Sequence, residues 1–102
     1  MATTGDSTPS YQPVIHHSAK RELQDVPPDT RDGLVSIIKA CARKQEPSQH
    51  SQATPIHGHP LFRVKCDKYR ALCSLQKPEL QVLVVAHRER VYDLMGVAEE
   101  RL

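Results

Sequence analysis

Residues 62–73 read FRVKCDKYRALC, and this stretch decides the fold. Two β-prone runs flank the dipeptide Asp67-Lys68, which has the length of a tight hairpin turn. A two-residue turn fixes the strand register, so we expect Cys66 to pair with Tyr69 and the rest of the hairpin to follow in step. Because directly paired side chains lie on the same side of a sheet, this register sorts the hairpin into two faces.

The two predicted faces differ in chemistry. One face gathers apolar and aromatic side chains, namely Phe62, Val64, Cys66, Tyr69, Ala71 and Cys73. The other face holds three cations, Arg63, Lys65 and Arg70, with no carboxylate among them. Like charges placed opposite each other destabilise a sheet, so such a cluster is typical of a site that binds an anion. An ordinary solvated face, whose cations extend into water, is the alternative that composition leaves open.

Further strands are expected on both sides of the hairpin in the chain. Residues 80–87 (LQVLVVAH) are the most apolar run and predict a central strand that is buried on both faces. Residues 61–66 and 69–75 supply the two hairpin strands, completing an antiparallel meander. Residues 11–17 (YQPVIHH) are β-prone, but Pro13 restricts them to an edge or to the first residue of a strand.

Two helices are expected before the meander. Ser18 offers an N-cap to a short helix that ends before Pro27, and a second helix runs from Pro28 toward Pro47. Residues 47–60 contain Pro, Ser, Gln and His with little apolar content, which predicts a loop. We therefore expect an α+β domain in which a small antiparallel β-sheet packs one face against an N-terminal helical hairpin.

The composition limits the chain to one small domain. At 102 residues, with 38% hydrophobic and 25% charged residues, it can close around a single modest core. Residues 1–10 are small and polar, which predicts a flexible N-terminus. Residues 11–94 should form the domain, and residues 95–102 a short C-terminal tail.

The cysteines and the hydropathy indicate the compartment. The three cysteines are an odd number and none forms a CxxC pair, so we expect them to fill the core rather than to bind metal. The sequence contains no signal-peptide pattern and no apolar stretch long enough to cross a bilayer. These features predict a reduced, cytoplasmic protein with no membrane partner.

Basic residues concentrate toward the second half of the chain. Residues 57–92 carry seven basic and three acidic side chains, an excess of four positive charges. The last predicted strand leads into HRERVY, residues 87–92, which brings more cations and an aromatic ring to the same sheet. Cleavage of an RNA phosphodiester needs cations around the phosphate oxygens, a proton acceptor for the 2′-hydroxyl, a proton donor for the leaving oxygen and a stacking surface. The residue types at this end of the sheet match that requirement.

The order of these segments resembles a known family. A helical hairpin, a polar loop, FRVKCDKYRALCSL, an apolar strand and AHRERVYDL together resemble the RelE branch of the RelE/ParE toxin superfamily, over about residues 14–94. The resemblance implies a RelE-like, microbial-ribonuclease-like fold. It also implies a messenger-RNA interferase that acts in the ribosomal A site, promotes attack of a 2′-hydroxyl on the adjacent phosphate, and needs neither a metal nor another cofactor.

The resemblance implies roles for particular residues. Lys65 would accept the proton, since a lysine crowded by cations releases its own proton more readily. Arg63 and Arg70 would stabilise the phosphate and the transition state. Arg88 would stabilise developing charge or donate a proton, and Tyr92 would be the stacking platform. The remaining residues expected to bind substrate are Lys68, Arg90 and His87.

Departures from the family and the histidines need separate treatment. Position 63 is arginine where the best-known active members have lysine, so Arg63 would be a permanently charged clamp. The hairpin turn is also shorter than in those members. His87 precedes Arg88, and strand parity places neighbours on opposite faces, so we expect His87 to face the core or the helices. His57 and His59 have an HxH spacing without an evident third metal ligand, which favours a compositional effect of the loop.

Partners and an alternative function follow from the resemblance. A free nuclease of this kind would stop the growth of its host, so we expect an antitoxin with an acidic or helical segment to mask the basic face in a toxin-antitoxin hetero-oligomer. The ribosome and messenger RNA are the other expected partners. The alternative is a non-catalytic protein of the same fold, either a gyrase-directed toxin or an inactive antitoxin-binding homologue. The set of cations and tyrosine favours the nuclease, because a pure binding protein has no need of it.

Overall fold

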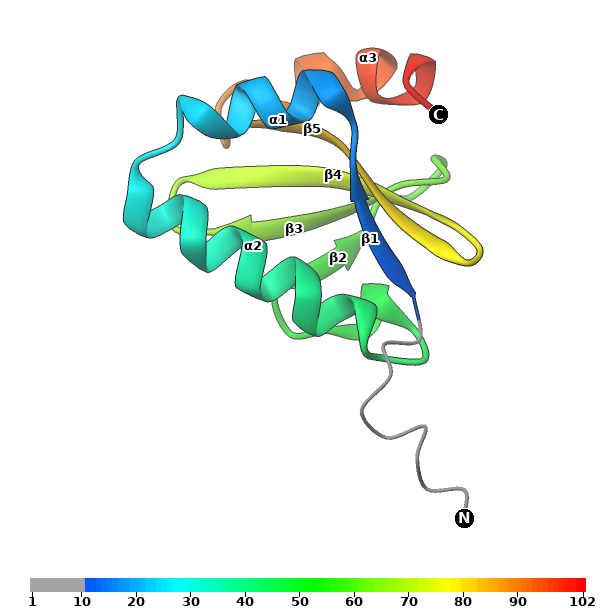
Figure 1. Cartoon of the computed structure of the whole chain (residues 1–102). Coiled ribbons are helices and arrows are strands. Elements are labelled where there is room, and N and C mark those ends of the chain that lie inside the picture. The colour runs from blue at the N-terminus through cyan, green and yellow to red at the C-terminus, as the bar shows by residue number, and fades with distance from the viewer. Residues whose placement is uncertain (1–10) are drawn as a thin grey trace.

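The computed structural model describes residues 11–102 and has the expected α+β architecture (Figure 1). The predicted flexible segment, residues 1–10, lies outside the described residues. The elements in chain order are β1 (Gln12–Ile15), α1 (His17–Gln24), α2 (Pro28–Ala42), the 3₁₀ helix η2 (Pro47–Gln49), β2 (Ala53–Pro55), β3 (Phe62–Cys66), β4 (Tyr69–Gln76), β5 (Glu79–His87), the 3₁₀ helix η3 (Val91–Leu94) and α3 (Met95–Glu100). The strands form one sheet in the order β1-β5-β4-β3-β2.

The predicted hairpin register is confirmed. Strands β3 and β4 pair antiparallel, with Cys66 opposite Tyr69 and Phe62 opposite Cys73. Asp67 in the turn has a φ of 56°, a left-handed conformation that Asp tolerates better than most residues. Strand β1 is an edge strand, as Pro13 requires, and it pairs in parallel with β5, so the sheet is mixed rather than wholly antiparallel.

Strand β5 is central, as predicted, and contains a β-bulge. Leu72 of β4 pairs with Val84 and the next residue, Cys73, pairs with Val82, so Leu83 is the extra residue of the bulge. Two consecutive side chains, Leu83 and Val84, therefore join the same buried cluster. From the bulge to the end of β5, each side chain therefore faces the side of the sheet opposite to the one that strict alternation would give it.

The sheet is covered on both faces. Helices α1 and α2 cover one face, where Leu23, Leu34 and Ile38 pack with Val82 and other strand residues (Figure 1). The opposite face carries a second buried cluster, whose members are Leu61, Leu72, Leu83, Val84, Val91 and Ala98. Here the expectation of helices on one face only is wrong, because η3 and α3 supply the last two of these residues. Residues 95–102, predicted to be a tail, begin with α3, and the predicted domain boundaries stay a prediction.

The beginning and end of the helices differ from the expectation. Helix α1 starts two residues earlier than expected because His16, not Ser18, is its N-cap, and the His16 ring nitrogen Nδ1 accepts a hydrogen bond from the Ser18 amide at 3.1 Å. Helix α2 ends at Ala42, five residues before Pro47, which begins η2.

The predicted loop at residues 47–60 contains a strand, so that prediction is wrong in part. Strand β2 pairs with β3, with Ala53 opposite Val64 and Pro55 opposite Phe62. The sequence pattern did not reveal it because the strand is only three residues long, contains Pro55 and is half exposed. A short, proline-containing strand is a typical way to cover the exposed edge of a sheet.

The cysteines fill the core, as expected. Cys41 and Cys73 are fully buried and all three thiols are free. Burial raises the pKa of the Cys41 thiol to about 11 and also raises the pKa of Cys73, so neither is a reactive thiolate near neutral pH. Within residues 11–102, no helix combines the length and the apolarity needed to cross a membrane.

The second buried cluster provides a stability prediction. Leu72 is fully buried there, so Leu72→Ala should lower the free energy of unfolding by about 2–5 kcal/mol, through lost transfer energy and the cavity left behind. Denaturant titration should show a lower midpoint at an unchanged slope. The control, Leu102→Ala, removes a side chain that is 47% exposed and should change stability by about 0.5 kcal/mol or less. An equally small loss for Leu72→Ala would mean that η3 and α3 do not cover this face.

Candidate functional site

Four of the predicted cations share one end of the sheet, and we call them the basic face: Arg63, Lys65, Arg70 and Arg88. The hairpin register places Lys65 directly opposite Arg70, so the two side chains leave the same face of the sheet. Arg88 follows β5, and its amide donates to the carbonyl of Lys68 in the β3–β4 turn at 2.8 Å. That hydrogen bond brings the segment after β5 against the hairpin turn.

Tyr92 joins the basic face through Arg63. The guanidinium Nη1 of Arg63 donates a hydrogen bond to the Tyr92 hydroxyl, and its central carbon lies 5.7 Å from the centroid of the tyrosine ring. The Tyr92 side chain is nevertheless 64% exposed. An aromatic ring that is held at one end and open to solvent is suited to stacking on a planar group.

Arg70 is the electrostatic centre of the basic face. Its pKa is lowered, first by burial and then by the nearby charges of Arg63 and Arg88, while Tyr92 acts in the opposite direction. Nη1 of Arg70 donates to the carbonyl oxygens of Asp67 and Tyr69, both at 2.9 Å. Backbone carbonyls orient this guanidinium without neutralising it, so its positive charge stays available to an anion.

No carboxylate in the described part of the chain forms an ion pair with the basic face. The two ion pairs found among residues 11–102 are His59–Glu99 and Glu22–Arg101, both elsewhere. Cations brought together without a counter-ion repel one another, which costs stability that a bound anion would restore. Structurally, this arrangement favours the anion site over the solvated face, the alternative that composition left open.

The other predicted site residues are divided between two places. Lys68 is exposed in the hairpin turn beside Arg88. His87 is paired with Tyr69, and their rings meet edge to face at a centroid distance of 5.5 Å. His87 therefore lies on the helix side of the sheet, which confirms its expected direction. Arg90 lines the same pocket as His87.

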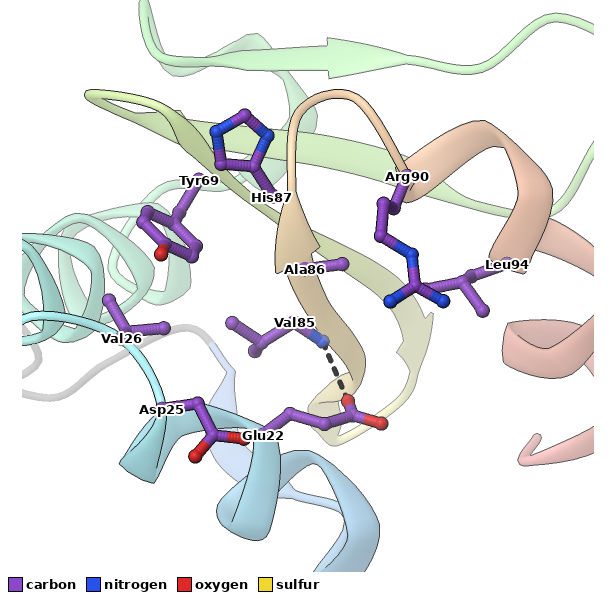
Figure 2. A pocket seen from close by; sticks show the side chains of 9 residues that line it. All are labelled: Glu22, Asp25, Val26, Tyr69, Val85, Ala86, His87, Arg90 and Leu94. Carbon is purple, nitrogen blue, oxygen red and sulfur yellow. Dashed lines mark hydrogen bonds between the residues drawn. The ribbon is translucent and has the colours of Figure 1, made fainter.

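His87 and Arg90 line a pocket of about 310 Å³, which we call the α1–β5 pocket (Figure 2). Val26 and Leu94 contribute to its apolar wall. Its chemically active lining residues are Glu22, Asp25, Tyr69, His87 and Arg90. The two carboxylates were not predicted, because nothing in the local pattern of α1 reveals that its C-terminal end lies against β5.

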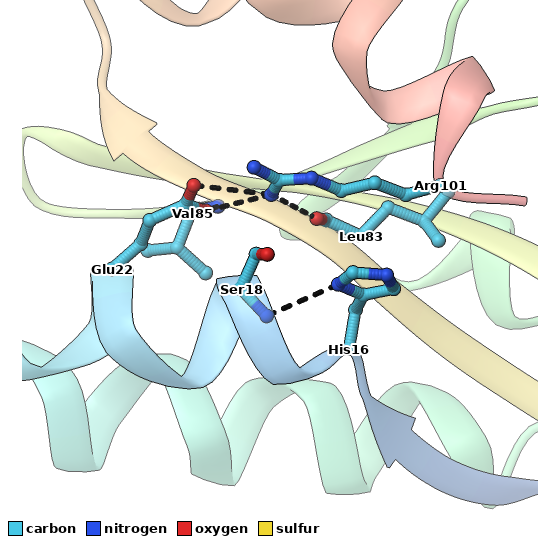
Figure 3. A network of polar contacts seen from close by, with 6 residues as sticks. All are labelled: His16, Ser18, Glu22, Leu83, Val85 and Arg101. Carbon is cyan, nitrogen blue, oxygen red and sulfur yellow. Dashed lines mark hydrogen bonds and ion pairs between the residues drawn. The ribbon is translucent and has the colours of Figure 1, made fainter.

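A polar network closes the edge of β5 beyond β1 (Figure 3). Glu22 accepts a hydrogen bond from the Val85 amide at 2.9 Å, and Arg101 donates to the Leu83 carbonyl at 2.8 Å. Glu22 and Arg101 also form an ion pair at 3.0 Å. The two side chains thus satisfy backbone groups that β1, which pairs only as far as Val82, leaves without a strand partner.

The two histidines of the HxH pair, His57 and His59, have different surroundings. His59 pairs with the Glu99 carboxylate of α3, whereas His57 is exposed. Within the described residues 11–102, no group of three or more His, Cys, Asp or Glu side chains is arranged to hold a metal ion. His59 therefore connects the β2–β3 loop to the C-terminal helix.

Comparison with known proteins identifies the fold. No protein-family model and no curated protein matches the sequence. Among solved structures, a chain of the RelB-RelE antitoxin-toxin complex from Methanococcus jannaschii matches at a TM-score of 0.65 and 21% identity, over 78% of this chain and 95% of that one. A chain of the RelBE2 toxin-antitoxin complex from Mycobacterium tuberculosis matches at a TM-score of 0.65 and 23% identity, over 81% of this chain and 97% of that one.

A third match is a chain of the RelE-RelB complex from Pyrococcus horikoshii, at a TM-score of 0.66 and 19% identity, over 79% of this chain and 98% of that one. The alignment covers nearly the whole length of each matched chain. The chain therefore has the RelE-type toxin fold, which confirms the predicted fold class.

The unpaired charge of the basic face predicts stabilisation by anions. Phosphate should raise the free energy of unfolding more than chloride does at equal ionic strength, because it binds the folded state at Arg63, Arg70 and Arg88. An anion present at ten times its Kd adds about 1.4 kcal/mol. Thermal unfolding at matched ionic strength would measure the difference.

A matched pair of variants separates this site from general salt effects. Arg63→Gln combined with Arg88→Gln should abolish the phosphate increment, whereas Arg21→Gln, an exposed position on α1, should leave it unchanged. The same increment in all three proteins would show that phosphate acts elsewhere.

Proposed function

We propose that the chain is the toxin of a type II toxin-antitoxin system, a ribosome-dependent endoribonuclease that cuts messenger RNA in the A site. The observation that carries the proposal is the basic face itself, in which cations from β3, β4 and the segment after β5 meet beside an exposed tyrosine and lack carboxylate partners. The RelE-type toxin fold supports it, since the solved structures that share this fold are toxin-antitoxin complexes.

The proposed chemistry is attack by a 2′-hydroxyl on the adjacent phosphate. Lys65 accepts the hydroxyl proton, Arg70 and Arg63 bind the non-bridging oxygens, and the charge on the phosphorane grows as the new bond forms. Arg88 stabilises that charge or gives a proton to the departing 5′-oxygen. The cations occupy the place where carboxylates would be needed to hold Mg²⁺, which supports a reaction without a metal at the scissile phosphate.

Tyr92 is proposed as the stacking platform beside the phosphate. Its hydrogen bond from Arg63 restricts the ring while leaving it open to solvent. Stacking of a base on an exposed ring contributes about 1–3 kcal/mol and tolerates any base. Arg63, where the best-known active members of the family have lysine, thus has a second role, because a planar guanidinium can both bind phosphate and lie against the ring.

The proposed partners are a cognate antitoxin, the ribosome and messenger RNA. The matching structures are complexes of a toxin with an antitoxin, which supports a toxin-antitoxin hetero-oligomer here as well. A basic face without internal counter-ions favours a partner that presents carboxylates to it. A cytoplasmic location belongs to the same proposal.

Loss of Arg88 should reduce cleavage most. An arginine that faces developing charge contributes about 2.7–4 kcal/mol, so Arg88→Ala should slow cleavage by roughly 10²–10³-fold in a translating system. The domain should stay folded, because residue 88 is exposed. Arg21→Ala on α1 is the control and should cleave normally. Toe-printing of the message would measure both, and an Arg88→Ala protein that cuts at the wild-type rate would favour the non-catalytic alternative.

Lys65→Arg tests the assignment of the proton acceptor. Arginine keeps the positive charge but does not deprotonate near neutral pH, so cleavage should fall by at least about tenfold while RNA binding is retained. Lys39→Arg on α2, an exposed lysine outside the basic face, should change neither. Wild-type cleavage by Lys65→Arg would make Lys65 a clamp only.

The product ends distinguish the mechanism. Attack by the 2′-hydroxyl should leave a 2′,3′-cyclic phosphate on the upstream fragment and a 5′-hydroxyl on the downstream fragment. Resistance of the upstream end to polyadenylation, relieved by a 2′,3′-cyclic phosphatase, would detect it. A free 3′-hydroxyl immediately after cleavage would contradict the mechanism.

A further inference from the structure

The α1–β5 pocket lies along the edge of β5, where residues from both faces of the sheet line it, and one of them, Ala86, is paired with Arg70 of the basic face. His87 is paired with Tyr69, whose neighbour Arg70 belongs to the basic face. Residues 87–92 pass between the two sites, so that His87 and Arg90 line the pocket while Arg88 and Tyr92 belong to the basic face. A strand of RNA that follows this segment can contact both.

Two opposite charges at the rim of the pocket are exposed to solvent and have no protein partner among the described residues. Asp25 and Arg90 approach it from different sides, and neither side chain forms a hydrogen bond or an ion pair within residues 11–102 (Figure 2). Glu22 differs from them, because it is already engaged by the Val85 amide and by Arg101. A ligand that bridges Asp25 and Arg90 must therefore offer donors on one edge and acceptors on another.

Two rings in the pocket suit a planar ligand. Tyr69 and His87 are inclined at 77° to each other, so a flat group that stacks on one ring lies nearly perpendicular to the other. Nδ1 of His87 accepts a hydrogen bond from the Glu89 amide at 3.2 Å, so the proton of the neutral imidazole is on Nε2. Stacking on aromatic rings together with hydrogen bonds to base edges is how proteins bind single-stranded RNA bases.

We propose that the α1–β5 pocket binds a guanine base of the RNA. Guanine presents adjacent donors, N1–H and the N2 amino group, which Asp25 accepts with its two oxygens. On another edge it presents the acceptors O6 and N7, which an arginine such as Arg90 binds with two donors. Adenine lacks the adjacent pair of donors, and the pyrimidines lack N7. That the guanine belongs to RNA rests on the proposed function, whereas the chemistry of the pocket does not.

Binding of mononucleotides to the isolated protein tests the pocket without the ribosome. The protein carries Arg88→Ala, so that the test is independent of cleavage, and amide chemical shifts are followed by NMR during titration with GMP, AMP and CMP. GMP should shift the amides of residues 85–87 and bind at least about tenfold more tightly than AMP or CMP, which corresponds to about 1.4 kcal/mol. Equal binding of GMP and AMP would overturn the proposal.

Matched variants assign the effect to named side chains. Asp25→Asn replaces one acceptor by a donor that opposes the guanine donors, and it should weaken GMP binding at least tenfold; Arg90→Gln should also weaken it. Asp29→Asn, an exposed carboxylate in the first turn of α2, should leave the Kd unchanged. GMP shifts that survive Asp25→Asn, or that are confined to Arg63, Arg70 and Tyr92, would show that the nucleotide occupies the basic face and would refute the pocket.

The remaining outcomes separate this inference from the proposed function. Selective GMP binding by a protein that never cuts messenger RNA would support the pocket and refute the nuclease. Cleavage on the ribosome by a protein whose pocket amides ignore GMP would do the reverse. If those amides ignore GMP but move when the co-expressed antitoxin binds, the pocket belongs to a protein partner and the proposal is wrong.

Discussion

The β-bulge at Leu83 is the constraint on which the arrangement of both sites depends. Strand β5 must bury apolar side chains on two faces, and strict alternation would give each face every second residue. By placing Leu83 and Val84 on one face, the bulge completes the cluster beneath η3 and α3 and then reverses the parity of the strand. His87 consequently faces the helices. The strand ends with its polar residues divided between the two sides of the sheet.

The hairpin could be predicted because its information is local. A two-residue turn with β-prone flanks leaves one register that separates cations from apolar residues, and Lys65 lies opposite Arg70 accordingly. The bulge, the cover of the second face and the α1–β5 pocket could not be predicted in this way. Each depends on which distant segments come together, as those that carry Asp25 and Arg90 do around the α1–β5 pocket, and neither residue belongs to a periodic pattern. His16 was missed as a cap because histidine seldom takes that role, whereas its ring nitrogen can accept the same hydrogen bond as a serine hydroxyl.

The candidate nuclease site combines positions of unequal rigidity. Arg63, Lys65 and Arg70 stand on paired strands, and two carbonyl groups orient the Arg70 guanidinium. Tyr92 stands on a short 3₁₀ helix and is oriented by the side chain of Arg63. Rigid strands suit groups that must meet a phosphate in fixed geometry, while a more adaptable ring suits the varied bases of a message. Under the proposed function, the strands would bind the constant RNA backbone and the ring on η3 would accommodate the variable bases.

The contact between Glu22 and Arg101 has a consequence for the order in which the chain folds. These residues are 79 positions apart, so the Leu83 carbonyl at the edge of β5 beyond β1 lacks its side-chain partner in a nascent chain until residue 101 has left the ribosome. The strands can pair earlier, since their contacts are closer in sequence. An incomplete chain therefore carries an open strand edge, which favours aggregation or capture by a chaperone. When Arg101 binds the Leu83 carbonyl and Glu22, that strand edge is no longer free to pair with another chain.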